Sequence, residues 1–158
     1  MNTEFSNEYH LWYHLNNNKW NIDSYKHVYT IKTIADFWKL FNTWDNTNSL
    51  TSRHYFLMKK DIKPTWEDNS NGGCWSIKST EADAITIWTQ LSAYMICEIL
   101  CPKISSEIIG LSICMKKNNS VIIKIWNSNN INNSIEFINK DILNQWGIDI
   151  IYISYDSK

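Results

Sequence analysis

Three helical segments divide the chain, and each follows a pair of segments in which apolar and polar residues alternate. The helices are predicted at residues 33–44, 81–100 and 134–146, where apolar residues recur three or four positions apart. Seven strands are predicted, at residues 9–15, 25–31, 54–59, 74–78, 108–115, 121–126 and 148–155. Strands joined by short connections pair antiparallel, and the helices need one apolar face to cover. The pattern therefore predicts an α+β fold, a curved antiparallel sheet of about seven or eight strands with three helices behind it.

The ends of these helices carry residues with well-understood capping chemistry. Thr33, with Asp36 three positions later, resembles a capping box, in which each side chain bonds to the other residue's backbone N–H. Thr80 and Ser134 precede the other two helices, and their hydroxyls are predicted to cap them. Pro102 cannot continue a helix, so the second helix is expected to end by residue 100.

The size and charge of the chain limit what it can bind. Its 158 residues are 44% hydrophobic, which predicts one domain over residues 1–158 with a sizeable core. The net charge is −1, so the chain cannot hold nucleic acid through bulk electrostatics, and any such contact is expected to be local and to depend on stacking. The nine tryptophans exceed what this core needs, so several are expected to line a surface. Four are interpreted as packing residues: Trp12, Trp75, Trp88 and Trp146.

The sequence contains no pattern typical of a metal site or of catalysis. The four cysteines include no C-x-x-C pair and have no neighbouring pair of histidines, so no metal and no cofactor are expected. There is no phosphate-binding glycine loop, and no histidine has an evident serine or cysteine partner. The first residues do not read as a secretion signal, and no apolar run reaches about 18 residues. The expectation is a non-enzymatic protein of the cytoplasm or nucleus.

The segment at residues 64–75 combines loop-forming residues with two groups suited to a flat ligand. Pro64 disfavours helix before it and two later glycines mark turns, so Trp66 and Glu67 are expected on a loop. A loop tryptophan offers a stacking surface, and the adjacent carboxylate offers two acceptor oxygens. Guanine presents two adjacent donors, N1–H and the exocyclic amine, which match one carboxylate. Methylation at N7 makes guanine a cation, and an indole face attracts a cation by roughly 0.5–2 kcal/mol.

The tryptophans around this loop occur in a distinctive order. The motifs are Leu-Trp-Tyr at 11–13, Lys-Trp at 19–20, Asp-Phe-Trp at 36–38, Trp-Glu-Asp at 66–68, Gly-Gly-x-Trp at 72–75 and Lys-Ile-Trp at 124–126. From about residue 9 to its end, the chain resembles the translation initiation factor 4E family, which binds the 7-methylguanosine cap of mRNA. The resemblance implies a cup-shaped fold with the three helices on the convex face of the sheet.

The resemblance also implies which residues hold the cap base. Trp20 and Trp66 would sandwich the base, each stack contributing ~1–3 kcal/mol. The Glu67 carboxylate would accept from the edge of the base, the Trp66 N–H would donate to the base carbonyl, and Trp126 would touch the methyl group. Two structural alternatives stay open: Trp20 as a strand-end aromatic and Glu67 as a solvated loop carboxylate. Asp68 is interpreted as a structural residue that orders the turn.

The phosphate end of the implied site departs from the family pattern. The family's arginine position falls on Lys116 and its lysine position on Ile122. Lys124, two residues after Ile122 on the same strand face, is predicted to replace the missing lysine. Lys117 is a further candidate close by. A further basic position of the family falls on Cys74. Lysines supply charge without the bidentate fork of arginine, so the phosphates would be held by point charges.

The helix at residues 33–44 carries a second apolar stripe beside the one that faces the core. Ile34 and Trp38 form this stripe, which leaves Trp38 partly exposed. In the family, that tryptophan and a neighbouring apolar residue receive a short helix from scaffold or repressor proteins, together with two leucines of the second helix. Those leucine positions fall on Thr89 and Ala93, so an altered partner specificity is expected. The alternative is a helix with an unusually wide core face.

Three functions remain open on the sequence. The leading one is an initiation factor that delivers capped mRNA for translation, and the second is a cap-binding repressor or competitor that does not support initiation. The third is a carbohydrate-binding module, because tryptophan-lined sheets also stack sugars. Glu67 and the lack of a secretion signal argue against the third. The protein is expected to act as a monomer.

Overall fold

Seven strands form one antiparallel sheet, in the spatial order β2-β1-β3-β5-β6-β4-β7. The computed structural model describes residues 3–15, 22–44, 50 and 53–157. The strands are β1 (Glu4–Leu15), β2 (Tyr25–Thr33), β3 (Arg53–Lys59), β4 (Gly73–Ser79), β5 (Ile108–Met115), β6 (Val121–Asn127) and β7 (Ile150–Ser154). Within the described residues, no helix combines the length and apolar character needed to span a bilayer.

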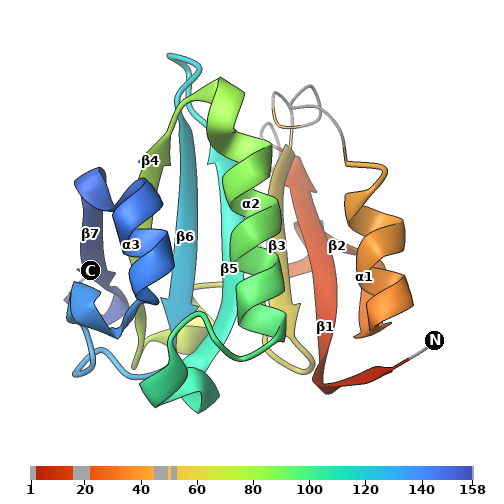
Figure 1. The fold of residues 1–158 in the computed structure, drawn as a ribbon, viewed down its shortest axis with the longest axis horizontal. Helices are drawn as coiled ribbons and strands as arrows, with labels where there is room; N and C mark the ends of the chain where they lie inside the picture. The colour runs from red at the N-terminus through yellow and green to blue at the C-terminus, as the bar shows by residue number, and fades with distance from the viewer. Residues whose placement is uncertain (1–2, 16–21, 45–49, 51–52, 158) are drawn as a thin grey trace.

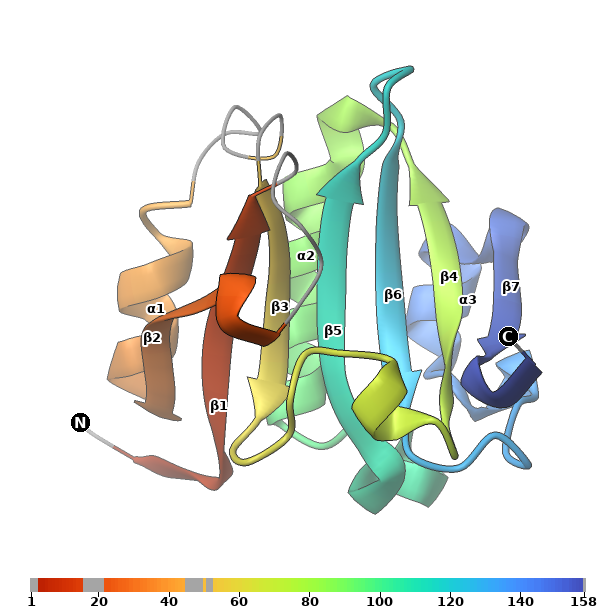
Figure 2. The same ribbon diagram turned by 180° about the vertical axis from the view of Figure 1, so that it is seen from behind.

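The three helices all lie on one face of this curved sheet (Figure 1). They are α1 (Ile34–Phe41), α2 (Glu81–Ile96) and α3 (Lys140–Trp146). Figure 2 shows the opposite face, which none of the three α-helices covers and which the loop between β3 and β4 crosses. The predicted fold class, an antiparallel sheet backed by three helices, is confirmed, with seven strands.

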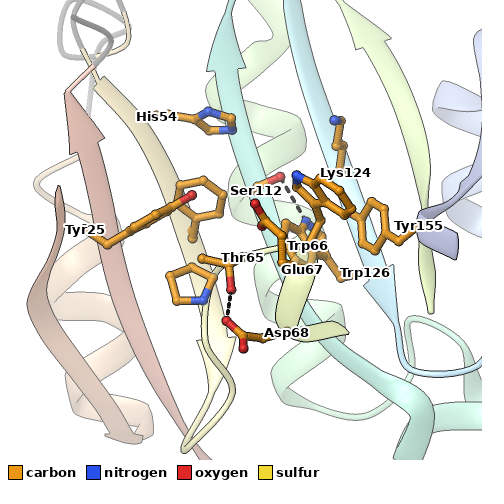
Figure 3. A pocket seen from close by; sticks show the side chains of 12 residues that line it. Tyr25, His54, Thr65, Trp66, Glu67, Asp68, Ser112, Lys124, Trp126 and Tyr155 are labelled. Carbon is orange, nitrogen blue, oxygen red and sulfur yellow. Dashed lines mark hydrogen bonds between the residues drawn. The ribbon is translucent and has the colours of Figure 1, made fainter. Parts of the chain in front are cut away.

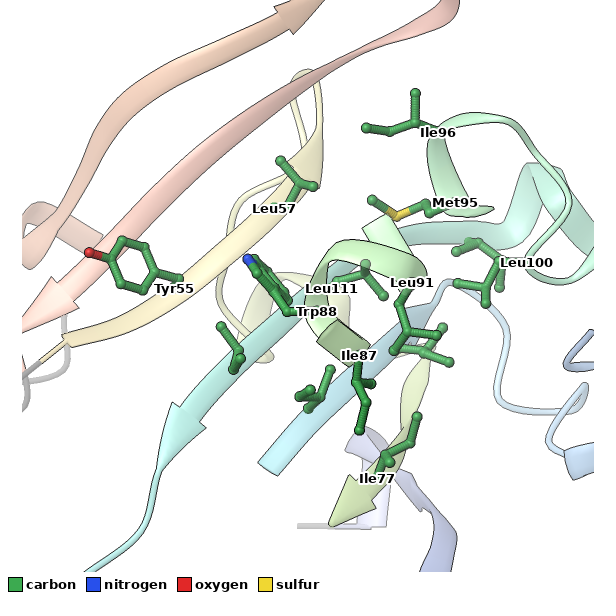
Figure 4. Packing of buried hydrophobic residues seen from close by; sticks show 14 of the residues in the cluster. Tyr55, Leu57, Ile77, Ile87, Trp88, Leu91, Met95, Ile96, Leu100 and Leu111 are labelled. Carbon is green, nitrogen blue, oxygen red and sulfur yellow. The ribbon is translucent and has the colours of Figure 1, made fainter. Parts of the chain in front are cut away.

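The main hydrophobic core lies between α2 and the helix-covered face of the sheet (Figure 4). Alternate residues of β5 and β6, among them Leu111, Ile113 and Ile123, are fully buried there because successive side chains of a strand point to opposite faces. Trp88 and Leu91 of α2 are fully buried against them. The other face of the sheet carries a second, smaller cluster of buried residues, among them Phe56 and Trp126.

Three of the four tryptophans predicted to pack do so in this core. Trp75 and Trp88 are 1% and 0% exposed, and Trp146 packs at the edge, where its Nε1–H donates to Gln90 Oε1 at 2.8 Å. Trp12 also packs, but in a second, smaller cluster on the opposite face of the sheet. Tyr9, Leu11, Tyr13 and Leu15 alternate along β1, so Trp12 lies on the other face of the strand, where it is partly buried.

The starts of α1 and α2 agree with the predicted caps. Thr33 Oγ1 accepts from the Asp36 N–H at 3.2 Å, and Asp36 Oδ2 accepts from the Thr33 N–H at 3.1 Å, which completes the capping box. Thr80 Oγ1 accepts from the Asp83 N–H at 3.2 Å. Both caps are local interactions between residues three apart, which is why the sequence pattern predicts them well.

The ends of these two helices come earlier than predicted. α1 ends at Phe41 and not at Trp44, and α2 ends at Ile96, well before Pro102. After α2, Glu98 adopts a φ of 63°, and the N–H groups of Ile99 and Leu100 both donate to the Tyr94 carbonyl. This left-handed turn satisfies carbonyls at the helix end and stops the helix before the proline is reached.

The predicted start of the last helix is wrong. Ser134 caps only a short 3-10 turn, Ile135–Phe137, and α3 begins at Lys140, where Asn139 is the capping residue. The Asn139 N–H donates to Leu100 O at 2.7 Å and its Nδ2–H donates to Ile99 O at 2.9 Å. These long-range bonds hold Asn139 outside helical geometry, so one predicted helix becomes two separate elements.

Candidate functional site

A pocket of about 370 Å³ lies on the face of the sheet that the helices do not cover (Figure 3). The loop between β3 and β4 supplies Pro64, Thr65, Trp66, Glu67 and Asp68. The sheet and its borders supply Tyr25, His54, Phe56, Ser112, Lys124, Trp126 and Tyr155. The pocket therefore combines an overhanging loop with a floor made by strands distant in sequence.

Trp66 and Glu67 occupy the exposed turn of that loop. Trp66 is 43% exposed, and the 3-10 turn Glu67–Asn69 follows it directly. The Asn69 N–H donates to Trp66 O at 3.0 Å, and the Thr65 hydroxyl donates to the Asp68 carboxylate. Asp68 therefore bonds within the turn, but its partner is the Thr65 hydroxyl and not the backbone N–H that the Asx-type bond expected of a turn aspartate would require.

The floor of the pocket is a connected series of aromatic rings. Tyr25 lies against Phe56 with ring centroids 5.4 Å apart, Phe56 meets Trp126 edge-on at 6.1 Å, and Trp126 meets Tyr155 at 5.2 Å. Trp126 is only 4% exposed, and its Nε1–H donates to Ser112 Oγ at 3.1 Å, which fixes the indole. An apolar floor below an exposed tryptophan and a carboxylate suits a flat ligand with a polar edge.

The register of the sheet explains why these floor residues meet. Phe56 pairs with Ser112, and Ser112 pairs with Lys124, so the three form one row across β3, β5 and β6. His54 lies two residues before Phe56 and therefore on the same face. The period-2 alternation could have shown which residues share this face, but only the register places them under the loop.

Charged groups stand at both ends of the pocket. Burial raises the pKa of the Tyr25 hydroxyl to about 12, and the negative charge of Glu67 contributes less in the same direction. The hydroxyl is therefore protonated. At the other end, burial lowers the pKa of His54 to about 3, and the positive charges of Lys124 and Lys116 act in the same direction. The imidazole is therefore neutral at physiological pH, and the lysines carry the positive charge at that end.

The three lysines predicted at the phosphate end are not equivalent in the structure. Lys124 lines the pocket, and Lys116 lies near enough to act on His54, but it is exposed at the end of the β5–β6 connection. Lys117 is exposed in the turn of that connection. Ile122 and Lys124 both stand partly buried on β6, two residues apart, as predicted.

Gly72 and Gly73 connect the loop to β4 where three strands converge. A Cβ on Gly72 would lie 1.9 Å from the Asn127 carbonyl oxygen, and one on Gly73 would lie 2.4 Å from the Ile153 carbonyl oxygen. The Gly73 N–H donates to Asn127 Oδ1 at 3.1 Å, and Asn127 is fully buried. The glycines are needed for close backbone approach, and this approach anchors the loop that carries Trp66.

A second, almost wholly apolar groove of about 200 Å³ lies on the helix-covered side, between α1 and α2. Ile34, Trp38 and Ala93 line it, and Trp38 is 50% exposed. Thr89 is partly buried on the same helix as Ala93 but is not among the lining residues. Sequence reasoning missed Phe5, which lines the groove from the first residues of β1.

Two further expectations concern Trp20 and the binding of a metal ion. Trp20 lies outside the described residues. Among the described residues, no three His, Cys, Asp or Glu side chains are grouped so that they could hold a metal ion.

The fold is a curved seven-stranded sheet with three helices on one face and a ring-lined pocket on the other, and comparison with known proteins identifies the family. The sequence profile of eukaryotic initiation factor 4E matches residues 4–156, so the chain belongs to the eukaryotic initiation factor 4E family. It is 33% identical over 128 residues to eukaryotic translation initiation factor 4E of Dictyostelium discoideum, covering 76% of this chain and 50% of that protein. It is 31% identical over 143 residues to factor 4E1 of Drosophila melanogaster, covering 85% and 54%. The chain spans about half the length of the curated relatives it matches.

Solved structures support the same fold. The complex of Caenorhabditis elegans eIF4E-3 with the 4E-binding protein Mextli and cap analog superimposes with a TM-score of 0.84, at 23% identity over 99% of this chain and 95% of that chain. Ascaris suum eIF4E-3 with m7G cap gives a TM-score of 0.82 at 23% identity, over 100% and 94%. At this identity the likeness concerns the fold.

Proposed function

We propose that this protein binds the 7-methylguanosine cap of mRNA in the ring-lined pocket and recruits capped mRNA for translation initiation. The observation that carries the proposal is the placement of Trp66 and Glu67 together on one exposed turn above an aromatic floor. Membership of the initiation factor 4E family and the cap bound to two of the similar structures support it. On this proposal the protein is a binding protein and not an enzyme, and it acts as a monomer in the cytoplasm.

Each group at the base end has a distinct role in this proposal. The Trp66 indole stacks on the methylated base, whose positive charge adds roughly 0.5–2 kcal/mol to the contact. The Glu67 carboxylate accepts from N1–H and the exocyclic amine, and the Trp66 N–H donates to the base carbonyl. Trp126 forms the floor beside the methyl group, and Trp20 is the second stacking ring.

One titration tests the proposal against its alternatives. Tryptophan fluorescence is measured during addition of 7-methyl-GTP, GTP and a neutral sugar. Quenching by 7-methyl-GTP at much lower concentration than by GTP is the expected result. Equal response to the two nucleotides would contradict cap recognition, and a response to the sugar alone would favour the carbohydrate-binding alternative.

The cap phosphates are proposed to lie toward Lys124, which lines the pocket, with Lys116 and Lys117 near the same end. The two lysines that act on His54 place a positive field there. Because these are ammonium groups without a bidentate fork, their contribution depends on charge and is screened by salt.

Lys124→Ala and Lys116→Ala are each expected to weaken 7-methyl-GTP binding and to flatten its dependence on salt. Binding of 7-methylguanosine, which has no phosphate, should stay nearly unchanged. Lys140→Ala, at the start of α3 on the other side of the sheet, is the matched control. Calorimetry at two salt concentrations measures both ligands. Equal losses for the two ligands would show that the lysine does not contact the phosphates.

The apolar groove between α1 and α2 is proposed to receive a helix from a scaffold or repressor protein, with Trp38 as its anchor. One of the structures similar in fold contains the 4E-binding protein Mextli. Recruitment of a scaffold would make this protein an initiation factor, and failure to recruit one would make it a competitor for caps.

A helical peptide of the Tyr-x-x-x-x-Leu type is expected to bind this groove weakly, because Thr89 and Ala93 replace two leucines. Ala93 lines the groove, so the missing methyl groups leave part of it unfilled. At about 0.8 kcal/mol per buried CH₂, Thr89→Leu/Ala93→Leu should tighten binding by roughly tenfold or more. Calorimetry of both proteins measures this, with Trp38→Ala as the loss-of-binding control. Tight binding by the unaltered protein would contradict the altered specificity.

A further inference from the structure

The side chain of Asn69 bridges two backbone carbonyls that flank Pro64. Its Nδ2 donates to Lys63 O at 3.0 Å and to Thr65 O at 2.7 Å. The Asn69 N–H also donates to Trp66 O at 3.0 Å. Asn69 is not one of the residues that line the pocket, yet it holds the segment that leads into Trp66.

The bond to Thr65 O bears directly on the backbone of Trp66. A peptide group is planar and trans, so its N–H points opposite to its C=O, and no cis peptide occurs among the described residues. Holding the Thr65 carbonyl toward Asn69 therefore turns the Trp66 N–H away from Asn69. In the described part of the chain, no backbone carbonyl accepts from that N–H. Trp66 and Glu67, which follows it in the chain, both line the pocket, so this backbone donor belongs to a pocket residue.

We propose that Asn69 is a positioning residue for base recognition, because it fixes the peptide plane that carries the Trp66 N–H. The Trp66 N–H and the Glu67 carboxylate then present one hydrogen-bond donor followed by acceptor oxygens along one edge of the binding site. This edge complements the carbonyl oxygen, N1–H and amine of guanine. The inference rests on the cap-binding function proposed above and adds a residue that touches neither the base nor the pocket.

Other bonds hold the turn itself, so the role of the Asn69 side chain can be separated from loop folding. The Thr65 hydroxyl still donates to Asp68, and the Asn69 N–H still donates to Trp66 O, when only the side chain of Asn69 is changed. The Gly72 N–H also donates to Asn69 O at 3.0 Å. Loss of the Nδ2 bonds should free the 65–66 peptide while the indole keeps its place.

Asn69→Ala and Asn69→Asp test the proposal, with Asn71→Ala and Asn71→Asp as matched controls. Asn71 is exposed in the same loop, and its aspartate variant adds the same charge near the ligand. Two measurements are made on each protein: the ¹⁵N order parameter of the Trp66 amide without ligand, and the affinities for 7-methyl-GTP and GTP. The first requires no ligand and reports directly on the peptide plane.

The Asn69 variants are expected to lower the Trp66 order parameter from about 0.85 to below about 0.6. They should weaken both nucleotides by about three- to tenfold, with the preference for the methylated one unchanged, because both present the same carbonyl. The Asn71 variants should match the unaltered protein.

An unchanged order parameter, or affinities like those of the Asn71 variants, would overturn the proposal. Collapse of the methyl preference would also overturn it, since Asn69 would then hold the whole loop. If the unaltered protein shows no preference for 7-methyl-GTP, the function proposed above fails, and the order parameter alone decides whether Asn69 holds the peptide.

Discussion

Glu67→Ala and Trp66→Ala should each weaken 7-methyl-GTP binding by roughly 1–3 kcal/mol, about five- to 150-fold. In the proposed site, the carboxylate would supply both acceptors for the two donors of guanine, so its removal would leave those donors without their partners. Loss of the Trp66 ring removes a stacking surface and its attraction for the methylated, positively charged base. Glu67→Gln should also bind weakly, because an amide has only one acceptor oxygen for two donors. Calorimetry or tryptophan quenching measures each affinity.

The chain offers close controls for both substitutions. Trp38 is exposed to a similar extent, 50% against 43% for Trp66, but lies on the helix-covered side, so Trp38→Ala should leave cap affinity unchanged. Glu136 is an exposed carboxylate in another 3-10 turn, and Glu136→Ala should likewise have no effect. Normal binding by Glu67→Ala would remove the basis of the proposed base recognition.

Gly73→Ala is expected to destabilise the protein by roughly 3 kcal/mol, with Gly72→Ala at least as severe. The new methyl group on residue 73 would lie 2.4 Å from the Ile153 carbonyl oxygen and 2.5 Å from the Tyr152 hydroxyl oxygen. That hydroxyl donates to Asn127 Oδ1 at 2.7 Å, so it cannot move aside without breaking a partly buried hydrogen bond. The clash therefore separates β4 from its neighbours β6 and β7. Urea denaturation measures the free energy of unfolding of each variant.

Gly147→Ala is the matched control for this prediction. A Cβ on Gly147 would lie 3.6 Å from the Leu143 side chain, an ordinary contact distance, and its φ of −79° suits any residue. The substitution should therefore be neutral or stabilise the protein by about 0.4–1 kcal/mol, because it restricts the unfolded chain. If Gly73→Ala and Gly147→Ala have equal free energies of unfolding, the strands around residue 73 can move apart enough to accept the methyl group, and the prediction is wrong.

Local chemistry explains which parts of the fold the sequence could predict. The capping box at Thr33 and the cap at Thr80 involve residues three apart, so their bonds depend on the local chain alone. The alternation of β5 and β6 likewise needs only the pleat of a strand. The loop that carries Trp66 and Glu67 was predictable because Pro64 fixes its own φ and disfavours a helix before it, and because a Gly-Gly pair is typical of turns. Family-like spacing of the tryptophans then pointed to the class of ligand.

The remaining features depended on residues that are distant in sequence. The start of α3 is decided by bonds from Asn139 to the carbonyls of Ile99 and Leu100, about forty residues away. The pocket floor needs the register that sets Phe56, Ser112 and Lys124 in one row, and a sequence cannot give that register because strand pairing is chosen by long-range packing.

Local sequence is enough to predict where α1 and α2 begin, which residues alternate along the strands, and that Trp66 and Glu67 lie on a loop. What that loop faces, and why it ends in two glycines, follows from contacts between distant segments. At Gly72 and Gly73, backbone atoms of β6 and β7 approach so closely that no side chain fits, and this convergence of three strands has no local signature. Local bonds are encoded by neighbouring residues, whereas close approach of separate strands follows from the packing of the whole sheet.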